Sequence, residues 1–152
     1  METLAPILAA HPFFRDLATP HLDLVVGCAS NVRFSAGAFM FHEGDEANRF
    51  YVIREGRVAV DVSIPGRDPV VVETVEHGEV LGWSWLFPPH VSRFNARVVE
   101  PVRAIALDGK CLRTKCENNP ELGYQMMSRF ARLMQNRISA LTLQLTDVYA
   151  AV

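Results

Sequence analysis

The chain has 152 residues, of which 49% are hydrophobic and 21% are charged. This composition is typical of one soluble globular domain and excludes a disordered chain. Its 15 basic and 17 acidic side chains give a net charge of -2, which argues against a general nucleic-acid binder. The charge is uneven, because residues 1–109 carry 9 basic and 14 acidic side chains and residues 110–152 carry 6 and 3. We therefore expect an acidic body followed by a basic C-terminal element.

The sequence carries no visible signal for export or membrane insertion. Residues 1–10 have no basic segment and no long apolar run, and no stretch of about 18 uncharged apolar residues occurs. The three cysteines (Cys28, Cys111 and Cys116) are odd in number and lack paired spacing, so a disulfide framework is not expected. Cys111 and Cys116 are interpreted as small buried hydrophobes. We expect a cytoplasmic protein.

Residues 1–30 are predicted to form short helices. Thr19 and Pro20 favour a helix start there, because threonine caps helices and proline suits the first helical position. The apolar residues that follow share one helical face: Leu22, Val25, Val26 and Ala29.

The residue pattern of 31–108 predicts a β domain. Short runs rich in β-branched and aromatic residues alternate with glycine-containing turns, one of them at Glu55-Gly56. The predicted strands are Asn31–Phe34, Ala38–His42, Arg49–Arg54, Arg57–Ser63, Pro69–Glu76, Arg93–Glu100 and Val102–Leu107. We expect a mainly β fold with flanking helices, in the form of a double-stranded β-helix or jelly-roll barrel.

After Leu107 the pattern becomes helical again. Asp108 is a candidate cap for a short helix through Cys116, and Asn119-Pro120 opens a long helix that reaches about Tyr149. Two apolar stripes run along the long helix. The first is Leu122, Met126, Phe130 and Leu133; the second is Met127, Ala131, Met134, Ile138, Leu141, Leu145 and Val148.

The second stripe has the alternating spacing of four and three residues that is typical of a coiled-coil seam. We expect the first stripe to pack on the barrel and the second to form a homodimer. The alternative, that both stripes pack on one globular body, stays open. The whole chain, 1–152, is thus predicted to be a single domain with a helical segment (1–30), a barrel (31–108) and C-terminal helices (109–150).

The glycine pattern resembles that of the cyclic nucleotide-binding domain family, and in particular the sensor domains of catabolite-activator-like regulators. The residues that carry the resemblance are Gly37, Glu43-Gly44-Asp45, the run from Phe50 to Val58, and Gly78-Glu79-Val80-Leu81-Gly82. It covers about residues 11–149. It implies a small-ligand-sensing regulatory domain whose ligand is a cyclic nucleotide or another small anion, with no further cofactor.

The resemblance also implies a phosphate-binding cassette that starts at Gly82 and ends near Arg93, eleven residues later. Helix N–H groups and the arginine would bind an anion. Relatives that bind cyclic AMP have a glutamate after the glycine, which accepts a hydrogen bond from the ribose hydroxyl. Here Trp83 stands in that place, followed by Ser84, and an indole can only donate. The small residues that follow the arginine in the family are replaced by Phe94 and Asn95.

On the long helix, the hydroxyl residues with which the family contacts the base align roughly with Arg137 and Ile138. We therefore expect weak binding of cyclic AMP or none. Two readings remain: the pocket binds a different small anion through Arg93, or its own aromatic side chains fill it. In the second reading the domain is a protein-interaction scaffold.

No enzyme or metal site is expected. The five histidines are scattered without a His-x-His pair, and no nucleophile has a supporting partner. The DNA-binding segment that follows the long helix in related transcription factors does not occur before Val152, so we expect no DNA binding by this chain alone. The expected partners are a second copy, a small anion and an unknown protein.

Overall fold

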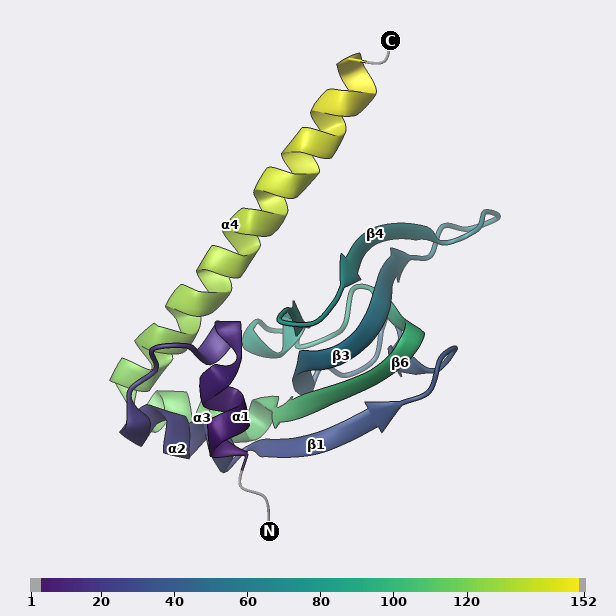
Figure 1. Cartoon of the computed structure of the whole chain (residues 1–152). Coiled ribbons are helices and arrows are strands. Elements are labelled where there is room, and N and C mark those ends of the chain that lie inside the picture. Colours follow the sequence, from purple (N-terminus) through teal and green to yellow (C-terminus); the bar gives the residue numbers. More distant parts are fainter. Residues whose placement is uncertain (1–3, 151–152) are drawn as a thin grey trace.

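The computed structural model describes residues 4–150 and consists of a curled β sheet with helices at one end and along one side (Figure 1). The helices are α1 (Ala5–Ala10), η1 (Pro12–Phe14), α2 (Thr19–Val26), η2 (Ser84–Leu86), α3 (Gly109–Asn118) and α4 (Pro120–Ala150). The strands are β1 (Ala29–Phe34), β2 (Phe39–Phe41), β3 (Arg49–Val62), β4 (Val70–Val75), β5 (Val80–Leu81) and β6 (Asn95–Asp108).

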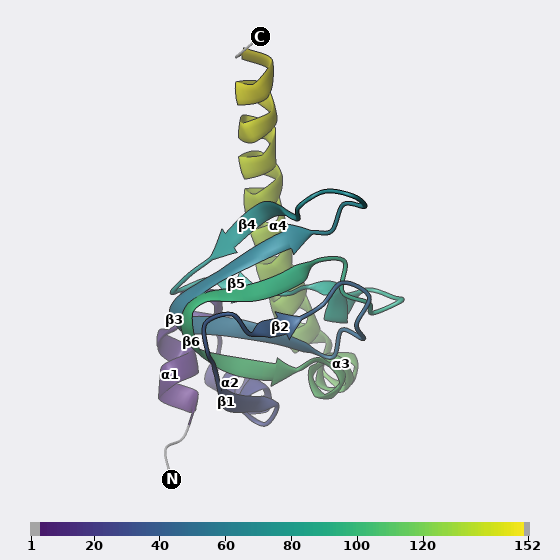
Figure 2. The same ribbon diagram turned by 90° about the vertical axis from the view of Figure 1, so that its right-hand side faces the viewer.

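Two long antiparallel strands, β3 and β6, form the centre of the sheet. β1 and β2 pair with β6, and β4 and β5 pair with β3, so the sheet curls around a common interior (Figure 2). Successive side chains of a strand face opposite sides. Tyr51 and Ile53 accordingly enter the barrel core, whereas Phe50 and Val52 join the core beneath the helices. The predicted jelly-roll fold is confirmed.

The predicted turn at Glu55-Gly56 is wrong, because β3 continues through it, and β6 likewise joins the predicted strands Arg93–Glu100 and Val102–Leu107. The β3–β6 register shifts between Ile53 and Arg57, so the chain forms a bulge there. Gly56 has φ +95°, and a Cβ at this position would lie 2.2 Å from the carbonyl oxygen of Pro101. The glycine therefore permits a bend within one strand rather than a reversal between two.

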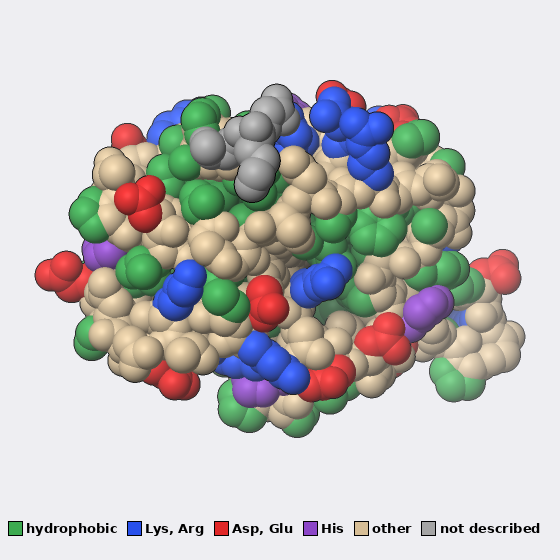
Figure 3. All heavy atoms as spheres, turned by 90° about the horizontal axis from the view of Figure 1, so that it is seen from below, with side chains coloured by type: hydrophobic (Ala, Val, Ile, Leu, Met, Phe, Trp, Pro, Cys, Tyr) green, Lys and Arg blue, Asp and Glu red, His purple; other side chains and the backbone are tan. Residues whose placement is uncertain are grey.

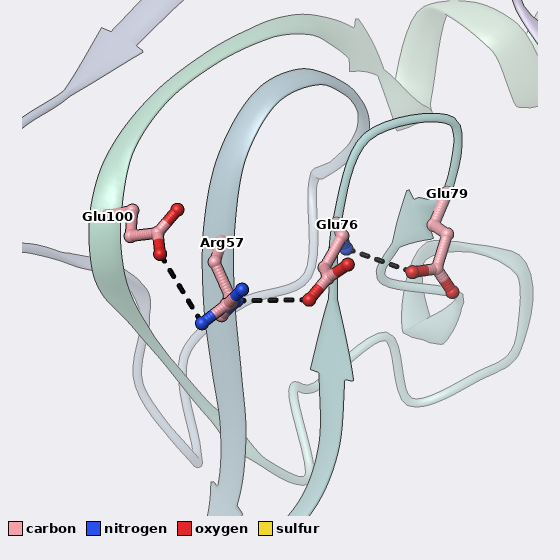
Figure 4. Close-up of polar contacts among 4 residues, drawn as sticks. All are labelled: Arg57, Glu76, Glu79 and Glu100. Atoms are coloured by element: carbon pink, nitrogen blue, oxygen red, sulfur yellow. Dashed lines mark hydrogen bonds and ion pairs between the residues drawn. The ribbon is translucent and has the colours of Figure 1, made fainter.

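A surface ion cluster lies beside this bulge (Figure 4). The Arg57 guanidinium lies 3.0 Å from Glu76 and 3.3 Å from Glu100, while Glu79 accepts a hydrogen bond from the Glu76 backbone N–H at 3.0 Å. These side chains are largely exposed, so each ion pair contributes at most about 1 kcal/mol. The cluster chiefly orients the turn after β4 against β3 and β6.

Two of the three predicted capping residues form a hydrogen bond with the first turn of their helix. Asp108 accepts from the backbone N–H of Cys111 at 3.0 Å, and Asn119 accepts from that of Leu122 at 3.2 Å, as predicted. At α2, by contrast, Thr19 is the first helical residue and no side chain caps the helix.

The long helix α4 packs on the body mainly through the first of its two stripes. Leu122, Met126 and Phe130 are buried, and Leu133 packs partly against the same core. In the second stripe Met134 also touches this core, but Met127, Ile138, Leu141, Leu145 and Val148 are between 45% and 65% exposed. The last turns of α4 extend past the barrel (Figures 1 and 2). Apart from Met134, the large apolar side chains of the second stripe are thus left uncovered by residues 4–150.

The expectation for the cysteines is wrong in part, because Cys28 and Cys111 form a disulfide. They are 83 residues apart in the sequence, and the pairing of Ala29 with Leu107 across β1 and β6 brings their segments together. Cys116 is free and half-buried. Sequence spacing could not show a contact that the sheet register creates. The cysteines accordingly give no reason for the cytoplasmic location, which stays an expectation.

Two further features of the described surface bear on partners. Within residues 4–150, no helix is both long and apolar enough to cross a lipid bilayer. Seen from the end opposite the tip of α4, basic and acidic side chains of the described residues are interspersed (Figure 3). This end offers a mixed-charge surface.

Candidate ligand-binding site

The segment predicted to bind phosphate lines a pocket in the barrel wall. Gly82, Trp83 and Ser84 contribute from the β5–η2 junction, and Arg93 and Phe94 contribute from the approach to β6. The remaining lining residues are Phe41, Ala47, Arg49, Val60, Glu73, Leu81 and Ser92. Five of the six predicted cassette residues therefore meet at one place.

The pocket wall is held from behind by Trp85, the buried residue of η2. Its indole stacks on Phe50 with ring centroids 4.9 Å apart, and its carbonyl accepts a hydrogen bond from Arg113 on α3. A Cβ on Gly109 would lie 2.9 Å from the Cβ of Trp85, so the start of α3 approaches η2 closely. Trp85 is thus a core residue that fixes η2, while Trp83 and Ser84 remain at the pocket.

Trp83 and Phe94 narrow the pocket. Their rings meet edge to face with centroids 6.4 Å apart, each half-buried. The cavity left between the lining residues has a volume of about 30 Å³. That space holds one or two water molecules. A ligand the size of a nucleotide needs these aromatic side chains to move.

Arg93 is one of two exposed arginines that line this pocket, the other being Arg49, and it forms no ion pair within residues 4–150. Its neighbour Ser92 is buried and held by backbone hydrogen bonds with Gly44 and Asp45, both 2.8 Å. The arginine thus projects from a fixed backbone position. A free guanidinium at a pocket rim can bind a phosphate or carboxylate with two parallel hydrogen bonds.

Asn95, the sixth predicted cassette residue, does not line the pocket. Its amide nitrogen donates to Asp61 at 2.9 Å and to Ser63 at 3.0 Å, and its oxygen accepts from the backbone N–H of Glu43 at 2.9 Å. These bonds occupy the amide. Asn95 instead joins the end of β3 to the loop after β2.

Of the two ligand contacts predicted on the long helix, Arg137 contacts the barrel and Ile138 does not. Ile138 is 65% exposed and lies on the uncovered stripe of α4. Arg137 reaches the barrel: its Nε lies 3.2 Å from Glu73, and its Nη2 donates to the carbonyl of Val72 at 3.1 Å. Nε is not aligned for a hydrogen bond, so its contact with Glu73 is chiefly electrostatic.

Sequence reasoning missed Glu73 and Arg49, the other charged side chains in the pocket wall. Burial raises the pKa of Glu73, and the nearby Arg137 partly opposes this. Glu73 comes from β4 and Arg49 from the start of β3, neither of which carries a local motif. Only the pairing of β4 and β5 with β3 places them beside the cassette.

A metal site needs several ligating side chains that lie close together. In the described part of the chain, no three His, Cys, Asp or Glu side chains gather closely enough to hold a metal ion. The charged side chains that line the pocket are those of Arg49, Glu73 and Arg93.

Comparison with known families agrees with this geometry. Residues 31–119, which include the barrel and the whole cassette, match the model of the family described as the cyclic nucleotide-binding domain. The chain belongs to the cyclic nucleotide-binding domain family. Members of this family are regulatory domains whose ligands are cyclic nucleotides.

Two curated relatives illustrate the range of the family. A CRP-like cAMP-activated global transcriptional regulator of Mycobacterium tuberculosis is 25% identical over 93% of this chain and 64% of its own length. The chain thus spans a little under two thirds of that regulator. The human cGMP-dependent protein kinase 2 is 27% identical over 62% of this chain, but over only 12% of the kinase.

Solved structures share the fold along most of the chain. A putative cyclic nucleotide-binding protein from Geobacter metallireducens has a TM-score of 0.80 and 28% identity, covering 91% of this chain and 99% of that one. The catabolite activator protein of Thermus thermophilus has a TM-score of 0.69 and 22% identity, covering 90% and 63%. The second likeness concerns the fold alone.

Proposed function

We propose that this domain senses a small anion in the pocket between η2 and the start of β6, with Arg93 as its main charged contact. The observation that carries the proposal is the position of Arg93, which projects unpaired at the rim of the pocket lined by Gly82, Trp83 and Ser84. A guanidinium of this kind binds planar or tetrahedral oxyanions through two hydrogen bonds. The same side chain has no comparable structural role in the barrel.

We further propose that cyclic AMP binds weakly or not at all. Trp83 offers a donor where the ribose of a cyclic nucleotide needs an acceptor, and together with Phe94 it narrows the cavity to about 30 Å³. Loss of one hydrogen bond to a charged group lowers affinity by about ten- to a hundredfold. A smaller or differently shaped anion avoids both penalties.

A second candidate function is a scaffold that senses nothing. The edge-to-face contact between Trp83 and Phe94 favours it, because these rings already take up much of the space in the pocket. The domain would then act only through its outer surfaces, with α4 as the obvious one. The two functions differ in whether Arg93 has a ligand.

In either case we propose that the chain forms a homodimer through α4. The stripe that starts at Met127 and ends at Val148 exposes large apolar side chains along the part of the helix that the barrel leaves uncovered. Its heptad spacing matches a second copy of the same helix. In the sensor, a bound ligand would bias the position of α4 against the barrel, and a protein partner would respond to that shift.

The experiment that separates sensor from scaffold is a thermal-shift screen of the whole chain. Cyclic AMP, cyclic GMP and a panel of small phosphates and carboxylates are compared on the unchanged chain and on Arg93→Ala. A matched control is Arg33→Ala, which removes another exposed arginine, from β1. A sensor gains stability with one anion class, and only Arg93→Ala loses that gain. If no anion stabilises the chain, or if Arg93→Ala changes nothing, the sensor proposal fails and the scaffold remains.

A further inference from the structure

A second, larger cavity lies between α4, η1 and the turn that joins β4 to β5. Its volume is about 260 Å³. Its floor is Pro12 and Phe13, and one wall is formed by Gly78, Glu79 and Val80. From α4 it is lined by Arg129, Arg132, Leu133, Asn136 and Arg137, with Glu73 at the side nearest the first pocket.

Arg129 is fixed in the wall of this cavity. Its Nη1 donates to the carbonyl of Phe13 at 2.9 Å and to that of Arg15 at 3.0 Å. Its Nε is buried and has no hydrogen-bond partner among residues 4–150. The two carbonyls hold the Arg129 guanidinium in place, so its positive charge acts on the cavity that the residue lines.

The charges around the cavity favour an anion. Burial lowers the pKa of Arg129, and the positive charge of Arg132 lowers it further, against the opposing effect of Asp16. Of the two acidic side chains, Glu73 already pairs with Arg137, and Glu79 accepts from the backbone N–H of Glu76. Arg132 forms no ion pair with any residue that the structure describes. Three arginines thus face two carboxylates.

We infer that this cavity is a second anion site, which binds a small phosphate-type oxyanion. The exposed guanidinium of Arg132 is the direct charged contact, the fixed charge of Arg129 adds to it, and the amide of Asn136 supplies a further donor from the next turn of α4. Tetrahedral oxyanions suit such a set because they accept several hydrogen bonds at once. The cavity volume is sufficient for one phosphate with some of its water.

This site is independent of both the first pocket and the dimer seam. The Arg137–Glu73 pair stands between the two cavities, since Glu73 lines both of them. With about 100° of rotation per helical residue, Arg132 and Asn136 lie on the side of α4 roughly opposite the seam residue Met134. A homodimer through the seam therefore leaves the cavity open.

The test is an NMR titration of the whole chain with inorganic phosphate, at constant ionic strength maintained with chloride. We expect phosphate to shift the backbone signals of Gly78 and Val80 and the side-chain Nε–H signal of Arg129. In Arg132→Ala the dissociation constant should rise about tenfold, because one charged partner is lost. Arg132 is exposed, so this variant keeps the folded core. Asn136→Ala gives a second, smaller weakening.

Two controls make the outcome decisive. Arg33→Ala should leave the phosphate affinity unchanged, since Arg33 lines neither cavity. Arg93→Ala removes the charged contact of the first pocket, so the shifts of Gly78 and Val80 that persist in this variant report the second cavity. The inference is overturned if phosphate moves none of these signals, or if Arg132→Ala binds as tightly as the unchanged chain. It is also overturned if Arg93→Ala alone abolishes binding, because the ion then occupies the first pocket and supports the proposed sensor instead.

Discussion

Arg137 on α4 lies 3.2 Å from Glu73 on β4, and both side chains are mostly shielded from water, with exposed fractions of 22% and 13%. This contact joins the long helix to the barrel at the boundary between the two cavities. Any ligand that moves Glu73 or Arg137 therefore acts on the position of α4.

We expect Arg137→Ala and Glu73→Ala each to destabilise the chain, because each leaves a partly buried charge without its partner. A double-mutant cycle should give a coupling energy of about 1–2 kcal/mol, between the values for exposed and buried pairs. Urea unfolding of the two single variants and the double variant measures it. A coupling energy near zero would mean that the pair does not hold α4.

Trp83→Glu should raise the affinity for cyclic nucleotides by about ten- to a hundredfold, because it restores a charged acceptor and removes a large ring from the pocket. Isothermal titration with cyclic AMP measures the change. Trp83→Gln is the matched control, since it opens the same space without the negative charge. Equal affinity in both variants would show that space, and not the charge of the acceptor, limits binding.

Leu141→Glu should convert the proposed dimer to a monomer, because it places a charge in the middle of the apolar stripe. Sedimentation velocity at micromolar concentration shows the change in mass. Leu143→Glu is a suitable control, because Leu143 is also apolar and is 66% exposed. It lies two residues after Leu141 and therefore faces roughly the opposite side of α4. A monomeric mass for the unchanged chain would remove the dimer altogether.

Reduction of the Cys28–Cys111 disulfide should lower the free energy of unfolding by about 2–4 kcal/mol, because the bond closes a long loop in the unfolded chain. Thermal melts with and without a dithiol reductant test this. Cys116→Ser serves as the control, since Cys116 is free and should show the same sensitivity to reduction as the unchanged chain. If reduction leaves the melt unchanged, the disulfide does not form in solution.

Acidification from pH 7 to pH 5 should destabilise the fold through His11. This ring accepts a hydrogen bond from the backbone N–H of Phe13 through Nδ1, and its Nε2 lies 3.3 Å from the carbonyl of Ile53. Burial is the main cause that lowers the pKa of His11. The unfolded chain therefore binds a proton first, and stability is lost as the pH falls through the unfolded pKa of about 6.5.

His11→Asn tests the assignment, because its side-chain oxygen can still accept from Phe13 but does not titrate. Urea unfolding at the two pH values should show a smaller loss of stability in this variant. The contribution of Glu73 to the pH dependence of stability has the opposite sign to that of His11. Because the pKa of Glu73 is raised in the folded state, the fold gains stability as the pH falls further, toward the unfolded pKa of about 4.5. An unchanged pH dependence in His11→Asn would exclude His11 as the cause.

The sequence alone determined the fold class, most of the elements and most of the residues of the cassette. The glycine turns and β-branched runs predicted the barrel, and Asn119 marked the start of α4. The family resemblance around Gly82 and Arg93 predicted five residues that line one pocket. The predictions for the barrel and the helix rest on the local preferences of neighbouring residues, whereas the prediction for the cassette rests on the resemblance to a known family.

Only the tertiary structure decided the long-range contacts. Gly56 signalled a turn, but its close approach to Pro101 produces a bulge within one strand. Asn95 follows the cassette arginine closely, yet its amide is taken by Asp61 and Ser63 across the barrel. The disulfide, the Glu73–Arg137 pair and the second cavity likewise join segments that are distant in the sequence. Their physical basis is the strand register and the placement of α4 beside the barrel, which no local pattern encodes.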